Sequence, residues 1–179
     1  MTTRYHWEDL APGQSLELGH YDVTREEIIE FATRYDPQPF HIDEEAARSS
    51  LFGGLCASGW HTTAMAMRIV CDGYMLRAAS LGSPGVEQIR FLKPVFPGDR
   101  LHVRLEVLES RPMASRPGVG LMRFRWVTTN QHDQTVMTLE GWGMLARREP
   151  GAAGPAARPG AATPTGLPPP DRPPEDPSP

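Results

Sequence analysis

An aspartate and a histidine five residues apart, Asp36 and His41, are the side chains of this chain best suited to acid–base chemistry. Pro37 and Pro39 lie between them. Because proline fixes φ and keeps the preceding residue out of helical geometry, the segment is predicted to be a stiff, extended turn rather than the middle of a helix. A partly buried aspartate can have a raised pKa and exchange a proton near neutral pH, while the imidazole orients the same water. The same spacing also fits a turn aspartate beside a half-buried structural histidine.

The second candidate feature is Gly59, which ends the loop SSLFGGLCASG and directly precedes an apolar segment, residues 60–77, predicted to be one long helix. The first N–H groups of a helix have no partner within the helix and can bind a developing oxyanion, and glycine lets a carbonyl come close. An ordinary loop glycine, with Ser58 as the helix cap, explains the pattern equally well. Ser58 is not predicted to be a nucleophile, because ASGWH lacks the G-x-S-x-G spacing. His61 fits a satisfied core histidine better than a site residue.

Helices and loops predicted in the first half of the chain would position these groups. Residues 15–23 could form a strand. Thr24 and Glu27 have the spacing of a capping box, and the helix that they begin would deliver Asp36 at its C-terminal end. Asp43 is predicted to cap a second, short helix.

The second half of the chain is predicted to wrap the helix at residues 60–77. That helix is apolar on nearly all its faces, which is typical of a buried helix. Apolar and charged residues then alternate, as in strands with one buried face. The apolar positions of these strands are Leu101, Val103, Leu105, Val107, Met122, Phe124 and Trp126, and a last strand is expected at residues 136–146. An antiparallel sheet around a central helix, an α+β fold, follows from this pattern.

The chain length of 179 residues suits one domain, residues 1–147, and a C-terminal tail, residues 148–179. The tail consists almost wholly of proline, alanine and glycine with a few charges. Such a segment cannot bury enough apolar surface to offset the entropy lost on ordering, so the tail is predicted to be disordered.

The net charge of −4, with no cluster of lysine and arginine, argues against nucleic acid or an anionic membrane as a partner. Cys56 and Cys71 are the only cysteines, and because nothing around them has metal-ligand spacing, they are predicted to be buried thiols in a reducing compartment rather than a disulfide. The start of the chain lacks the apolar stretch of a secretory signal, and no apolar run is long enough to span a membrane. We therefore expect a soluble, cytoplasmic protein.

Three blocks of sequence, YDPQPFHID, FGGLCASGWHTTAMAMRIV and VEQIRFLKPVFPGD, occur in an order that resembles the MaoC-like dehydratases, which include the (R)-specific enoyl-CoA hydratases. The resemblance implies a hot-dog fold, a homodimer or dimer of dimers, and hydration of a trans-2-enoyl-CoA without metal or redox cofactor. Asp36 and His41 match the family pattern D-x-N-P-x-H and would be catalytic. Gly59 matches the glycine whose N–H binds the thioester oxygen. Gln38 stands where asparagine is usual, and Ala64 where some relatives have serine.

Substrate contacts can also be predicted from this resemblance. The acyl pocket is expected between the central helix and the sheet or along the dimer seam, lined by Phe40, Phe52, Leu55, Trp60 and Met65. Each of these five is also a plausible core residue. Arg90 and Lys93 are candidates to contact the phosphates of CoA, although a solvated strand face explains them as well.

Two other functions remain open from the sequence. A hot-dog thioesterase would share the fold and the acyl-CoA substrate, but such enzymes usually place an acid on or near the central helix, and here only Asp72 occurs late in that segment. A non-catalytic acyl-CoA-binding or assembly subunit is the other alternative. The Asp36–His41 pair argues against it, whereas Gln38 and Ala64 leave room for it.

Overall fold

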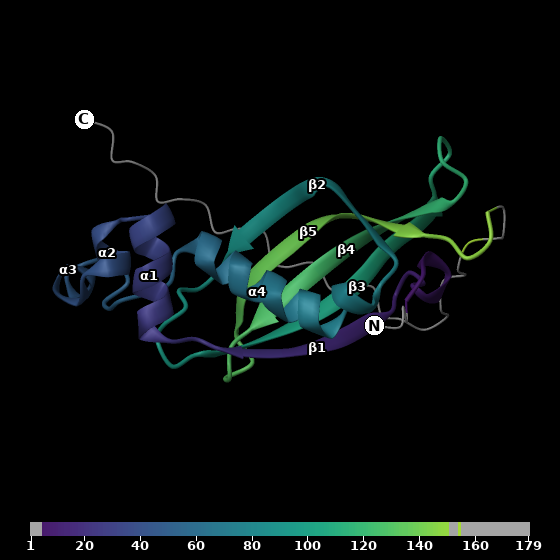
Figure 1. Cartoon of the computed structure of the whole chain (residues 1–179). Helices are drawn as coiled ribbons and strands as arrows, with labels where there is room; N and C mark the ends of the chain where they lie inside the picture. The colour runs from purple at the N-terminus through teal and green to yellow at the C-terminus, as the bar shows by residue number, and fades with distance from the viewer. Residues whose placement is uncertain (1–4, 151–153, 155–179) are drawn as a thin grey trace, which may run out of the picture.

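The computed structural model describes residues 5–150 and residue 154, which form an antiparallel sheet with one long helix across one face (Figure 1). The five strands, in order across the sheet, are β1 (Ser15–Asp22), β3 (Arg100–Pro112), β4 (Val119–Thr129), β5 (Thr135–Ala146) and β2 (Ser80–Phe91). The helices are α1 (Arg25–Tyr35), α2 (Pro39–Ile42), α3 (Glu44–Arg48) and α4 (Gly59–Gly73), with 3-10 turns η1 (Trp7–Asp9) and η2 (Met75–Arg77). The predicted α+β, hot-dog arrangement is confirmed. No helix in these described ranges is long and apolar enough to cross a membrane.

The sheet buries one face and exposes the other, as the alternation in the sequence predicts. All seven apolar positions named above, on β3 and β4, are buried. The opposite face carries a row of ion pairs that joins three strands, in which Arg125 binds both Glu106 and Glu140. One strand, β2, was not singled out in the sequence, and it forms an outer edge of the sheet beside β5.

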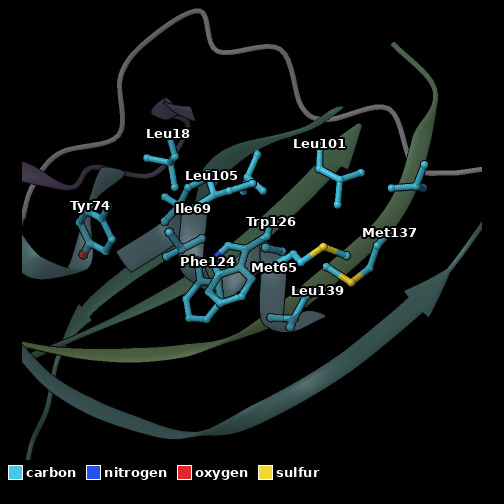
Figure 2. Packing of buried hydrophobic residues seen from close by; sticks show 14 of the residues in the cluster. Leu18, Met65, Ile69, Tyr74, Leu101, Leu105, Phe124, Trp126, Met137 and Leu139 are labelled. Atoms are coloured by element: carbon cyan, nitrogen blue, oxygen red, sulfur yellow. The ribbon is translucent and has the colours of Figure 1, made fainter. Parts of the chain in front are cut away.

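Helix α4 covers the buried face of the sheet and fills the centre of the hydrophobic core. Met65, Ile69 and Val70 pack against inward residues of the strands, and Figure 2 shows Met65 and Ile69 beside Phe124, Trp126 and other core side chains. The same cluster includes Leu18 of β1 and Met137 and Leu139 of β5. Helix α4 thus shares one hydrophobic core with residues of β1, β3, β4 and β5, and this core fixes its position.

Two predictions about this helix are wrong. It begins at Gly59 and ends at Gly73 rather than Arg77, and η2 follows it. At Gly73 the backbone lies directly on β1, where a Cβ would overlap the Leu18 carbonyl. Nor is the helix enclosed on every side within one chain, because Trp60 and Met67 are 62% and 39% exposed. The apolar sequence therefore covers both a core face and an outer face.

Helices α1, α2 and α3 gather at one end of the sheet, next to the N-terminus of α4 (Figure 1). Both predicted caps are present. Thr24 accepts a hydrogen bond from the N–H of Glu27 at the start of α1, and Asp43 accepts from the N–H groups of Glu45 and Ala46 at the start of α3. These caps fix the starts of α1 and α3, the helices that precede and follow the Asp36–His41 segment.

The N-terminal segment closes the opposite end of the core. Trp7 is fully buried, donates its indole N–H to the Leu121 carbonyl, and lies under the guanidinium of Arg147 at 4.8 Å. Arg148, the first residue after Arg147, forms a two-pronged ion pair with Asp9. The division into residues 1–147 and 148–179 stays a prediction, because residues 151–153 and 155–179 lie outside the described residues.

Replacing Gly120 with alanine should destabilise the protein, because a Cβ there would overlap the indole ring of Trp7. A rigid, hydrogen-bonded tryptophan cannot move aside cheaply, so we expect a loss of about 1–3 kcal/mol in the free energy of unfolding, measured by urea denaturation. Gly118→Ala is the matched control, since open space surrounds that position, and its effect should stay within about 0.5 kcal/mol. Equal stability of the two variants would contradict the packing described for Trp7.

Candidate active site

Asp36 is the C-cap of α1, and the chain leaves it in an extended conformation before turning into α2. The segment is therefore extended only at its start. His41 lies inside a short helix that begins at Pro39, which corrects the prediction of a turn throughout. Proline is tolerated at the first position of a helix, where its missing N–H would have no partner.

His41 is buried, and its ring orientation is set by the loop that precedes α4. Its Nδ1 lies 2.7 Å from the carbonyl oxygen of Cys56. Because a carbonyl only accepts hydrogen bonds, Nδ1 must be the nitrogen that carries the hydrogen. The neutral ring then has its free lone pair on Nε2, which points towards Asp36. That loop is itself held in place, since the Ala57 N–H donates to the Val95 carbonyl.

The Asp36 carboxylate faces this imidazole and is held by two donors. Its Oδ2 lies 3.6 Å from His41 Nε2 and accepts a 2.7 Å hydrogen bond from the Ser58 hydroxyl. Its Oδ1 accepts a 2.8 Å bond from Gln38 Nε2. The Ser58 bond holds the pKa of Asp36 below its ordinary value, with support from Gln38 and His41, although burial acts in the opposite direction. The expected raised pKa is therefore wrong, because donors outweigh desolvation.

A cavity of about 410 Å³ opens in front of these groups. We call it the Asp36 pocket. Of the residues predicted from the sequence, those that line it are Asp36, Phe40, His41, Phe52, Gly59, Trp60 and Lys93. Leu55 and Met65 lie instead in the hydrophobic core, and Arg90 lies on β2 outside the lining. The structure thus brings the three predicted catalytic residues to one apolar pocket of a size usual for small-molecule sites.

Gly59 is the first residue of α4, so its N–H lies at the positive end of the helix. No hydrogen-bond partner for this N–H occurs in the part of the chain that the structure describes. The ring of Phe91 lies over the glycine, where a Cβ would come within 2.6 Å of it. A donor is therefore available at the pocket wall, and glycine is the residue that fits there.

Several pocket residues were not predicted as site residues. Gln38 and Ser58 hydrogen-bond the carboxylate, the Cys56 carbonyl orients His41, and a stretch from Phe91 to Val95, of which only Lys93 was predicted, forms one wall. This wall corresponds to the sequence block FLKPV. Its contact with the loop before α4 joins residues that are far apart in the sequence, so local patterns do not predict it. Nothing in the local sequence indicates which hydroxyl reaches Asp36.

The other polar groups considered from the sequence lie away from this pocket. Asp72 forms a two-pronged ion pair with Arg68 on the surface of α4. His61 is buried as predicted and stacks on Phe31, and burial lowers the pKa of its imidazole. The prediction of a satisfied histidine is wrong, because its buried Nδ1 has no hydrogen-bond partner among the described residues. Among residues 5–150 and 154, no group of three or more histidine, cysteine, aspartate or glutamate side chains could hold a metal ion.

Comparison with known proteins identifies the family. Residues 9–123 match the MaoC like domain, so the chain belongs to the MaoC-like dehydratase family, whose members are generally hydro-lyases. It is 30% identical over 129 residues to the uncharacterized protein YdeM of Bacillus subtilis, covering 72% of this chain and 90% of that protein. The crystal structure of a MaoC-like dehydratase from Rhodospirillum rubrum is 38% identical, with a TM-score of 0.73 over 82% of this chain and 99% of that one. The R-hydratase PhaJ1 of Pseudomonas aeruginosa is 26% identical, with a TM-score of 0.60 over 80% and 86%.

The Cys56 thiol also lines the pocket, but it should not react as a nucleophile. Burial raises the pKa of this thiol to about 11, so the reactive thiolate is scarce near neutral pH. We expect iodoacetamide at pH 8 to leave Cys56 unmodified in the folded protein while the partly exposed Cys71 reacts, as read by peptide mass spectrometry. Both should react in concentrated urea. Rapid modification of Cys56 in the native protein would contradict this environment.

Proposed function

We propose that this protein is an (R)-specific enoyl-CoA hydratase, which adds water to a trans-2-enoyl-CoA to give a (R)-3-hydroxyacyl-CoA, or catalyses the reverse dehydration. The observation that supports this most directly is the approach of the Asp36 carboxylate to His41 Nε2 at 3.6 Å, beside an apolar pocket. Both facing atoms are hydrogen-bond acceptors, so a water that lies beside the pair and bridges them would donate one hydrogen to each. Such a water is held by two groups and is ready to lose a proton.

The tautomer of His41 supports a division of roles within the pair. Nε2 has the free lone pair, and the lowered pKa of Asp36 makes its carboxylate a poor proton acceptor. In the proposed reaction His41 removes one proton from water, and the oxygen forms a bond to C3 of the enoyl chain. The electrons of the C2–C3 double bond form a double bond between C1 and C2, and the carbonyl π electrons move to the thioester oxygen, which gives an enolate. His41 then returns the proton to C2, so one water supplies both added groups on one face.

The N–H of Gly59 is the proposed donor to that enolate oxygen. It has the positive end of α4 behind it and no competing partner in the described chain. Donors aimed at developing charge act strongly in a pocket that excludes water, and loss of one such donor typically costs about 100- to 1,000-fold in rate. The reaction transfers protons and shifts electron pairs with no net oxidation or reduction, and the proposed donor to the enolate oxygen is Gly59, so neither a redox cofactor nor a metal is proposed.

The acyl chain is proposed to lie against Phe40, Phe52 and Trp60, which line the apolar part of the pocket. The rings of Phe40 and Phe52 are 5.1 Å apart, beside His41. Lys93 lies in the same lining and has no ion-pair partner among the described residues, so it is free to meet a CoA phosphate. The name R-hydratase given to the Pseudomonas aeruginosa protein agrees with an R-specific hydration reaction.

We also propose that two copies of the chain form a cytoplasmic homodimer, which could pair further as a dimer of dimers. The outer edge of β2 has no neighbouring strand among the described residues. Large apolar side chains are exposed on this strand and on the outer face of α4, among them Leu81, Val86, Phe91, Trp60 and Met67. An exposed, apolar sheet edge of this kind favours pairing with another chain. The second copy would also cover the outer face of α4 noted above.

The function can be tested with purified protein and a series of trans-2-enoyl-CoA substrates, following loss of the enoyl absorbance and release of free thiol in parallel. Hydration removes the enoyl absorbance without releasing free thiol. Asp36→Asn and His41→Ala should each lower kcat by about 100- to 10,000-fold, because each removes a group that holds or deprotonates the water. Their melting temperatures should stay close to that of the wild type. Thiol release would identify a thioesterase instead, and silence in both assays would favour a binding or assembly subunit.

The dimer proposal predicts that a charge on the free edge of β2 separates the copies. Val86→Asp should shift the mass measured by light scattering from dimer to monomer, because an unpaired carboxylate would be buried at the seam. Val86→Thr, which keeps the β-branched shape, is the matched control and should remain dimeric. An unchanged mass for Val86→Asp would place the interface elsewhere.

A further inference from the structure

We propose that the Ser58 hydroxyl is a positioning residue for catalysis, because it ties the carboxylate oxygen that faces His41 to the first turn of helix α4. The proposal rests on the hydratase function above and assigns a role to a residue outside the predicted Asp36, His41 and Gly59 set. Ser58 does not itself touch the reacting atoms in this scheme. It acts through Asp36.

The geometry gives the hydroxyl two defined bonds. Ser58 is fully buried, its Oγ donates to Asp36 Oδ2 at 2.7 Å, and the same oxygen accepts from the N–H of Trp60 at 3.2 Å. A hydroxyl has a single hydrogen, so the bond from Trp60 fixes it as an acceptor there and leaves its hydrogen for the carboxylate. The helix start and the carboxylate are therefore linked through one atom.

The Ser58 hydrogen bond matters because the other donor to the Asp36 carboxylate is less firmly held. The residue lies at the end of α1, and the other donor to its carboxylate is the exposed side chain of Gln38. An exposed amide is a mobile anchor, whereas Ser58 is fixed by the core that fixes α4. The bond to Ser58 also reaches Oδ2, the atom 3.6 Å from His41. Without this bond, the Asp36 oxygen proposed to hold the water would no longer be fixed in position.

The hydrogen bonds through Ser58 also affect the ionisation of Asp36. In the chain from Trp60 N–H through Ser58 O–H to the carboxylate, each donor strengthens the next, and the positive end of α4 lies behind it. The Ser58 bond is the largest cause of the lowered pKa of Asp36. The titratable groups that share the pocket with Asp36 are His41 of α2, Cys56 of the loop before α4, and Lys93 of the segment after β2. Of these, His41 lowers the pKa of the Asp36 carboxyl through its charge when the imidazole is protonated.

The chain offers a matched control for the loss of such a hydroxyl. Thr24 caps α1 in the same way: it accepts from the Glu27 N–H and donates to the Glu27 carboxylate at 2.9 Å. Thr24→Ala therefore removes a cap and a carboxylate contact away from the Asp36 pocket. It should lower the melting temperature by about 2–4 °C while leaving turnover unchanged.

The first measurement compares kcat and KM for Ser58→Ala, Ser58→Thr and Thr24→Ala with the wild type. Ser58→Ala removes a hydrogen bond to a charged group and with it the fixed position of the carboxylate. We therefore expect kcat to fall by about 10- to 100-fold, with KM changed less than about threefold. Ser58→Thr keeps the hydroxyl and should recover most of the rate. Should Ser58→Ala not fold, Ser58→Cys, which keeps the shape with a weaker donor, should show a smaller fall in kcat.

The second measurement needs no substrate. Asp36 can be titrated by carboxyl carbon NMR in aspartate-labelled protein, with its signal assigned by its absence in Asp36→Asn. Removing a donor to the ionised form raises a carboxyl pKa, so the midpoint should move to higher pH in Ser58→Ala and stay in place in Thr24→Ala.

The proposal is overturned if the Asp36 midpoint does not move, or if Ser58→Ala retains kcat within twofold. It is also overturned if Thr24→Ala loses as much activity as Ser58→Ala, since the effect would then be one of general stability. A wild-type protein that hydrates no enoyl thioester would instead reject the hydratase function. The NMR titration would in that case still decide whether Ser58 controls the Asp36 carboxylate.

Discussion

Helix α4 packs its apolar face against the sheet, and the placement of the candidate site depends on that contact. Met65, Ile69 and Val70 fix the helix by burying their side chains among the strands. The N-terminus of the helix is fixed as a result, together with Gly59 and Ser58. A site that needs a donor, a carboxylate and an imidazole in defined positions benefits from a support of this stiffness, because small displacements of such groups are costly in rate.

The polar groups of the site are arranged by hydrogen bonds from three parts of the chain. α1 ends at Asp36, α2 contains His41, and the loop before α4 supplies the Cys56 carbonyl and the Ser58 hydroxyl. Each bond settles one chemical question, such as which nitrogen of the imidazole is free and which carboxylate oxygen is held. The proposed division between a proton-accepting histidine and an ionised aspartate depends on these partners rather than on residue type.

Local patterns predicted much of this fold well. The caps at Thr24 and Asp43, the start of α4 next to Gly59, and the alternating strands all depend on neighbours in sequence. Some predictions that depended on distant contacts failed. Leu55 and Met65 are core residues because the strands reach them, and α4 stops at Gly73 where β1 crosses it. Helix-forming sequence alone could not indicate that contact.

The sequence by itself indicated the class of protein and the three residues proposed to act on substrate, because three of its blocks resemble the MaoC-like dehydratases and Asp36, His41 and Gly59 match that family's pattern. The tertiary structure alone decided their chemical states. Ser58 reaches Asp36 across 22 positions of sequence, and this bond, with that of Gln38, lowers a pKa that burial would have raised. A pKa depends on every donor and charge within a few ångströms, and only the folded chain determines which groups those are.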